Sequence, residues 1–272
     1  MPGLVAAHFI GLCASAQDQA STLETPFSSV QAPTFGNNSL MLGIKSWGDS
    51  GRVREVVDPV GRQFELHNEY FVGLRNVNDW AFYATAVTDG DTFGDNTKTR
   101  YAAGDPFLTF QHPIYKDYST TVFGQIRQSF PVSTGSQAKG NLKKTRYWLI
   151  SDTAFANRVD LLNAFVPTYV YQDRYIGTET AYYIDDWTEL TKRMNGWLSV
   201  GVGQHTQVEW FRDKRSAAGI DVYPMADFIL SSNFSIGPRV YLPVFAKGLL
   251  SDGPTKVSTD NVQFELFTKI AL

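Results

Sequence analysis

Eleven charged residues of this 272-residue chain occupy alternate positions of extended, apolar-rich segments. Six are basic and five are acidic, namely Lys45, Glu69, Arg75, Arg127, Arg146, Glu209, Asp221, Asp227, Arg239, Glu265 and Lys269. In a β-strand successive side chains point to opposite faces, so these charges would share one face and the apolar residues between them the other. A wall of mixed charge attracts water and small polar solutes or ions, and this is the chemistry that the pattern predicts.

Catalytic and metal-binding chemistry finds little support in the sequence. Beyond residue 16 the histidines are His67, His112 and His205, which are far apart and lack the spacing of metal ligands. The chain has no Gly-x-Ser-x-Gly nucleophile motif, and its nearest approach, residues 197–201, lacks the first glycine. The single cysteine, Cys13, excludes a disulfide framework and a thiolate metal site. We therefore expect no enzyme activity, no metal and no cofactor.

The C-terminal segment indicates most clearly that the charged residues lie on β-strands. One side of an extended strand there would hold Val262, Phe264, Leu266, Thr268, Ile270 and Leu272, and the other Gln263, Glu265, Phe267, Lys269 and Ala271. Period-2 alternation of this kind suits a strand with hydrocarbon on one face and a polar interior on the other. Segments 194–203, 219–231 and 234–247 alternate in the same way.

The breaks between extended segments predict an antiparallel barrel of about twelve strands. We expect strands near 38–47, 63–76, 79–88, 105–113, 118–131, 143–153, 157–173, 194–203, 205–213, 219–231, 234–247 and 258–272. Short breaks, such as those at 77–78, Gln204 and 232–233, alternate with longer polar ones. Short periplasmic turns and longer extracellular loops are typical of transmembrane barrels, and an even number of strands puts both termini at the short-turn side.

The longest internal break, residues 174–193, predicts a loop with a short helix capped by Asp185 or Asp186. Folded into the barrel, this loop would form a constriction with Tyr182, Tyr183, Asp185, Asp186 and Trp187. Packed on neighbouring loops instead, the helix would lie outside the pore. The sequence leaves these alternatives open.

The N-terminal residues predict export from the cytoplasm. Residues 3–12 are mostly apolar and uncharged, and Ala14-Ser15-Ala16 matches the small-x-small pattern of a signal-peptidase site. We expect a signal peptide at 1–16, a lead-in segment at 17–37 and one barrel domain at 38–272. The net charge of −3 gives no reason to expect a nucleic-acid partner.

Together these features resemble bacterial outer-membrane β-barrel proteins of the porin or diffusion-channel type. Residues 264–272 look like the terminal signal by which the insertion machinery recognises this class, although Leu272 replaces the common terminal aromatic residue. Residues 68–71 and 79–83 are faintly similar to twelve-stranded nucleoside-channel porins. A soluble β-sandwich is the alternative fold, in which the aromatic residues would fill a core.

The resemblance implies an outer-membrane location, with outer-membrane lipids, the insertion machinery and small polar solutes as partners. We expect passive diffusion of such solutes through a mixed-charge lumen. A plugged barrel with a structural or surface-interaction role is the alternative, because twelve strands lie between the sizes of filled and open barrels. A membrane enzyme is a third, weaker reading. The oligomeric state is left open.

Overall fold

The computed structural model describes residues 34–35, 38–52, 62–93, 100–173, 180–231, 234–247 and 262–271. The expected signal peptide, residues 1–16, and most of the expected lead-in segment lie outside the described residues.

Nearly all described residues belong to antiparallel strands of a single sheet. The strands are β1 (Thr34–Phe35), β2 (Asn38–Arg52), β3 (Arg62–Asn76), β4 (Ala81–Phe93), β5 (Arg100–Ala103), β6 (Phe107–Lys116), β7 (Thr120–Ser129), β8 (Asn141–Phe155), β9 (Val159–Gln172), β10 (Thr180–Arg193), β11 (Leu198–Phe211), β12 (Ser216–Ser231), β13 (Phe234–Lys247) and β14 (Gln263–Ala271). The described residues also form two helical segments, α3 (Thr134–Ala138) and the 3-10 turn η2 (Ala156–Arg158).

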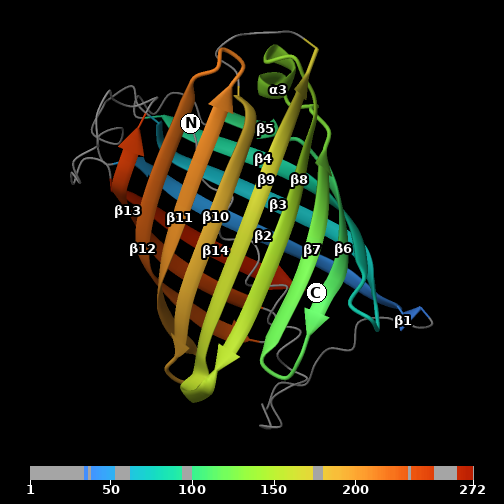
Figure 1. Ribbon diagram of the computed structural model, residues 1–272, viewed down its shortest axis with the longest axis vertical. Helices are drawn as coiled ribbons and strands as arrows, with labels where there is room; N and C mark the ends of the chain where they lie inside the picture. Colours follow the sequence, from blue (N-terminus) through green and yellow to red (C-terminus); the bar gives the residue numbers. More distant parts are fainter. Residues whose placement is uncertain are drawn as a thin grey trace.

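The sheet closes into a barrel of twelve strands (Figure 1). Strand β14 pairs with β13 on one side and with β2 on the other, and β2 continues to β3, which completes the ring. The short β1 and β5 are additions to β2 and β4. Closure gives each of the twelve strands a hydrogen-bonded partner on both sides, which is what an antiparallel sheet needs in hydrocarbon. The expected barrel is thus confirmed.

The connections at the two ends of the barrel differ in length. At one end the chain turns at 77–80, 117–119, 156–158 and 194–197, and only two residues separate β12 from β13. At the other end up to fifteen residues separate the strands. The strand directions place the start of β2 and the end of β14 at the short-turn end, as the even number of strands requires. Membrane barrels with short periplasmic turns have this asymmetry.

Strands β14 and β13 each have an exposed, largely apolar outer face and a buried inner face that carries charged residues. On β14, Phe264 and Leu266 are 50% and 47% exposed, whereas Glu265 and Phe267 are each 3% exposed. Because side chains alternate along a strand, this sorting puts Phe264 and Leu266 outside and Glu265 inside. The face assignment that the sequence predicts for β14 and for β13 agrees with this burial.

The wall between β4 and β6 is interrupted. Strand β4 pairs with β5 through Thr88–Asp91 and with β6 through Ala81–Thr85, so residues 104–106 break what would otherwise be one strand. Asp105, in this break, accepts hydrogen bonds from the Ser133 amide, at 2.9 Å, and from the Ser136 hydroxyl. These bonds hold α3 over the break. No helix among the described residues is long and apolar enough to cross a bilayer.

Two sequence predictions are wrong on the wall formed by β10 and β11. The expected loop at 174–193 forms β10 over Thr180–Arg193, and the expected turn at Gln204 lies inside β11. The real turn between these strands is 194–197. One strand was therefore missed and another was divided in two, which leaves the total of twelve unchanged.

Candidate lumen site

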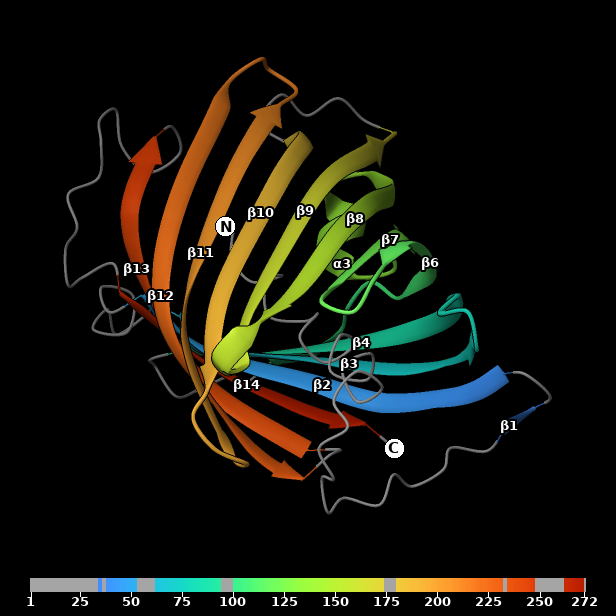
Figure 2. The ribbon, with the colours of Figure 1, turned by 60° about the horizontal axis from the view of Figure 1, so that its bottom comes forward.

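The inner wall carries most of the charged residues that the sequence singles out. Six of them are buried, namely Lys45, Glu69, Arg127, Arg146, Arg239 and Glu265, and four are partly buried, namely Arg75, Glu209, Asp221 and Asp227. Lys269 lies in β14 opposite Lys45 of β2. In Figure 2 the strands β2, β3, β4 and β14 face β8 to β11 across the interior. Arg127 of β7 reaches Glu69 of β3, with 3.6 Å between the charged groups.

Arg239 of β13 stands among three carboxylates from three other strands. Its guanidinium nitrogens lie 3.9 Å from Glu189 of β10, 3.9 Å from Asp227 of β12 and 3.8 Å from Glu265 of β14. These separations allow charge pairing but exceed a direct hydrogen bond. Nε, Nη1 and Nη2 make no hydrogen bond to a described residue. The Phe267 ring lies 5.1 Å from the guanidinium carbon and supports it by a cation–π contact. We call these five residues the Arg239 cluster.

A glycine in β11 gives the Arg239 cluster its hydrogen-bonding support. Glu189, Gly203 and Tyr223 are in register on β10, β11 and β12. A side chain at 203 would collide with the Tyr223 ring, so glycine lets that ring cross β11. The Tyr223 hydroxyl then donates to Glu189 at 2.7 Å.

The wall formed by β6, β7 and β8 is predominantly basic. Arg127 and Arg146 are paired in register on β7 and β8. Arg127 lies 3.6 Å from Glu69, and its guanidinium carbon lies 4.1 Å from the centre of the Phe107 ring. Arg146 donates to the Tyr183 hydroxyl of β10 at 2.7 Å. The interior thus places an arginine pair on one wall and, in the Arg239 cluster, three carboxylates around one arginine on another.

An aromatic stack joins β8, β10 and β11 inside the barrel. The rings of Trp148 and Trp187 are 5.4 Å apart and nearly parallel, and those of Trp187 and His205 are 4.7 Å apart and also parallel. His205 Nε2 lies 3.3 Å from a carboxylate oxygen of Asp185. No pattern in the sequence indicates this stack, because the register that aligns Trp187 with His205 depends on β10 being a strand.

The five residues of the expected constriction loop are divided between the two faces of β10. Tyr183, Asp185 and Trp187 are buried on the inner face, and Tyr182 and Asp186 lie on the outer face between them. No loop therefore narrows the lumen through these residues. Three of the five do reach the interior, but from a strand of the wall.

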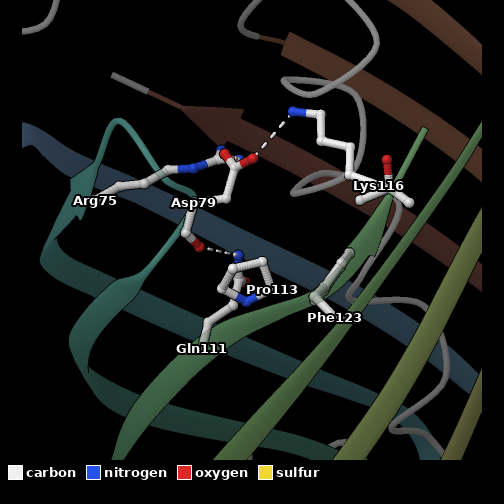
Figure 3. A pocket seen from close by; sticks show the side chains of 7 residues that line it. Arg75, Asp79, Gln111, Pro113, Lys116 and Phe123 are labelled. Atoms are coloured by element: carbon white, nitrogen blue, oxygen red, sulfur yellow. Dashed lines mark hydrogen bonds and ion pairs between the residues drawn. The ribbon is translucent and has the colours of Figure 1, made fainter. Parts of the chain in front are cut away.

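A small pocket opens at the short-turn end (Figure 3). Asp79, in the turn between β3 and β4, accepts a hydrogen bond from Arg75 at 2.6 Å and one from Lys116 at 3.0 Å. Partial burial opposes ionisation of Asp79, yet the hydrogen bonds and charges of Lys116 and Arg75 hold its pKa below the usual value. Arg75 therefore has its partner near the mouth of the barrel rather than at mid-height.

The three histidines within the described residues lie apart from one another and do not converge on a catalytic group. His67 lies 2.5 Å from Asp89 and stacks on Trp47, His112 contacts Tyr147 on the outer wall, and His205 belongs to the aromatic stack. Among the described residues, no three His, Cys, Asp or Glu side chains are grouped in a way that could hold a metal ion.

Similar proteins are found by structure rather than by sequence. No protein-family model matches this chain, and no curated protein sequence does. An outer membrane channel from Pseudomonas putida F1 aligns with 92% of this chain and 100% of its own, with a TM-score of 0.61 and 9% identity. The chain thus has the fold of an outer-membrane barrel. A phospholipase A from Escherichia coli aligns less well, over 92% of this chain and 94% of its own, with a TM-score of 0.44 and 10% identity. A porin of Rh. blastica aligns over 86% of this chain and 100% of its own, with a TM-score of 0.31 and 8% identity.

Proposed function

We propose that this protein is a channel of the bacterial outer membrane that lets small polar solutes diffuse through a mixed-charge lumen. The apolar outer face suits outer-membrane lipids as partners, and the alternating β14 suits recognition by the barrel-insertion machinery. The lumen residues in this proposal are the eleven charges of the inner wall, together with Tyr183, Asp185 and Trp187.

The Arg239 cluster is the observation that carries the proposal. Its three ion-pair separations of 3.8–3.9 Å are too long for direct hydrogen bonds, so the buried guanidinium needs further hydrogen-bond partners. Buried polar groups are costly unless they are hydrogen-bonded, so charges held at this spacing favour a hydrated interior over a dry one. Because both signs line the interior, we expect polar solutes to pass with only weak ion preference.

Conductance in planar lipid bilayers tests the proposal. Reconstituted protein should give ohmic steps, and neutralising Asp221, Asp227 and Glu265 together should shift the ion selectivity toward anions. Removing three negative charges from a narrow, low-dielectric pore changes its local counter-ion balance. Asp186→Asn is the matched control, since it removes a carboxylate from the outer face and should leave the selectivity unchanged.

A plugged barrel without transport is the second candidate, and the burial at mid-height favours it. Trp148 and Tyr223 are fully inaccessible to solvent, and Arg127 and Arg239 are each 1% exposed. Wild-type protein that is folded, by its gel mobility and circular dichroism, yet silent in the bilayer would support this candidate against the channel.

A further inference from the structure

A row of polar side chains crosses the outer wall where lipid-facing residues should be apolar. Ser151, Asn163, Thr188 and Gln204 are in register on β8, β9, β10 and β11, and Asp186 and Thr206 pair in the next row. All six lie on the outward side, because their strand neighbours Ile150, Ala164, Trp187 and His205 are buried inside. We call these six residues the outer polar row. Figure 1 shows the four strands side by side.

The outer polar row lies at the middle of the membrane-facing band. Toward the long loops, β10 reaches an aromatic pair, Tyr182 and Trp210, with ring centres 5.1 Å apart. Toward the short turns its outer face ends at Lys192, which is exposed. A tilted strand segment of this length rises by about 25 Å, which is the height of the apolar band of a membrane barrel. Asp186 and Thr188 lie on either side of its midpoint.

Contacts within the outer polar row supply a hydrogen bond to only one of the two carboxylate oxygens of Asp186. Asn163 Nδ2 lies 2.8 Å from Thr188 Oγ1 and 3.5 Å from Asp186 Oδ1. Gln204 donates to Thr206 at 3.0 Å. The second carboxylate oxygen of Asp186 receives no hydrogen bond from a described residue. On the outer faces of β9, β10 and β11, three strands that the structure describes in full, Asp186 is the only acid.

The opposite wall offers a useful contrast. Ser46, Asn68 and Thr88 are also polar, outward-facing and in register on β2, β3 and β4. All three are neutral, and they bond to one another, with Ser46 donating to Asn68 at 2.6 Å and Asn68 to Thr88 at 3.3 Å. The polar groups of this row hydrogen-bond to one another, whereas the outer polar row contains a carboxylate that needs a further hydrogen-bond donor.

We propose that the wall of β9, β10 and β11 binds the same wall of a second copy of this chain, with Asp186 of each copy facing Gln204 of the other. Two copies inserted in the same orientation are related by a two-fold axis along the membrane normal, which brings residues from either side of the axis into contact. Asp186 supplies an acceptor and the exposed Gln204, on the adjacent strand, supplies a donor, so the surface is complementary to itself. A charged group at mid-membrane depth is retained where a partner satisfies it.

The apolar residues beside the outer polar row provide the rest of such an interface. Leu190 and Val202 flank it on the short-turn side, and Leu149 and Phe165 flank it on the other. All four are between 39% and 46% exposed. Packing between such side chains, with hydrogen bonds at the centre, is how membrane-embedded surfaces associate.

Sedimentation equilibrium of the full-length protein in detergent micelles tests this proposal. The wild type should be a dimer, and Asp186→Leu should raise the dimer dissociation constant at least tenfold. Asn68→Leu is the matched control, because it makes the same kind of change on the opposite wall and should leave the constant unchanged. Folding of each variant is verified by heat-dependent gel mobility. A monomeric wild type, or equal dissociation constants for wild type and Asp186→Leu, overturns the proposal.

Cross-linking gives a second measurement that leaves Asp186 intact. In a Cys13→Ser background, Thr188→Cys should form a disulfide-linked species of twice the chain mass in native membranes, and Val72→Cys, exposed on the opposite wall, should not. Cross-links from Thr188→Cys only to other proteins, or none at all, would contradict a second copy as the partner. The result does not depend on conductance, so it stands or falls separately from the channel proposal.

Discussion

Strands β10 and β14 have similar inner faces and very different outer faces. Inside, each contributes a buried carboxylate, Glu189 and Glu265, to the same Arg239 cluster. Outside, β14 carries apolar Phe264 and Leu266, whereas β10 carries Asp186 and Thr188 at mid-height. The inner residues of the two strands contact the same arginine, so the residue types on one inner face limit those on the other. The residue types on each outer face are limited only by what surrounds that part of the barrel. The difference indicates that these two sections of the outer wall have different neighbours.

The largest loss of stability should follow substitution of Arg239, which pairs with the inner carboxylates of both strands. Arg239→Met removes the single positive charge from among three carboxylates, and leaving a buried charge uncompensated costs about 3–5 kcal/mol. We expect a loss of this size in the free energy of unfolding, measured by tryptophan fluorescence in urea with lipid vesicles.

A triple variant distinguishes the effect of the lost charge from the effect of the lost side-chain packing. Adding Glu189→Gln and Glu265→Gln to Arg239→Met should restore part of the stability, because it removes two of the uncompensated charges while leaving the cavity. If the triple variant is as unstable as Arg239→Met, the cluster acts through packing and the two inner faces are not coupled electrostatically.

Arginine substitutions on the two outer faces should differ in their effect. Leu266→Arg puts a charge against hydrocarbon on β14 and should cost about 2–4 kcal/mol. Thr188→Arg should cost less, because Asp186 lies two residues away on the same face of β10 and can pair with the new guanidinium. The folded fraction of each variant after dilution from urea into vesicles measures the difference. Equal losses would mean that Asp186 does not compensate the guanidinium introduced at position 188.

The same contrast explains which strands the sequence could predict. On β14 and β13 nearly every second residue is apolar, so alternation alone identifies the strand and its faces. On β10 the outward Asp186 and Thr188 add polarity to the face that should be apolar, and Asp185-Asp186-Trp187 looks like the start of a helix. The residues that concealed the strand are those of the outer polar row.

The candidate site was predicted in part for a related reason. Inward-facing charges such as Arg127 and Arg239 follow from alternation along one strand, and the structure places both in the interior. Their partners do not follow, because Arg239 meets Glu189 three strands away, through the curvature of the barrel. Gly203 shows the same limit: it resembles a turn residue locally, but it makes room for Tyr223 of the next strand.

The turn between β3 and β4 belongs to neither β10 nor β14. Substitution of Asp79 in this turn should cause the smallest change in the free energy of unfolding. The pKa of Asp79 lies below its usual value, so the folded state holds this proton less strongly than the unfolded state. The contribution of Asp79 is therefore present above the usual aspartate pKa of about 4 and is lost as the pH falls below it. Because Lys116 and Asp79 are partly exposed, we expect about 1 kcal/mol or less.

Unfolding free energies of wild type and Asp79→Asn, measured between pH 7 and pH 3, test this expectation. The two proteins should differ by this small amount at pH 7 and converge as the pH falls. Lys116→Met should remove part of the difference, since Lys116 is one of the two groups that lower the pKa of Asp79. A difference that grows toward pH 3 would reverse the sign of the argument. A difference at pH 7 as large as that caused by Arg239→Met would show that the turn, as much as the shared inner cluster, sets the stability of the barrel.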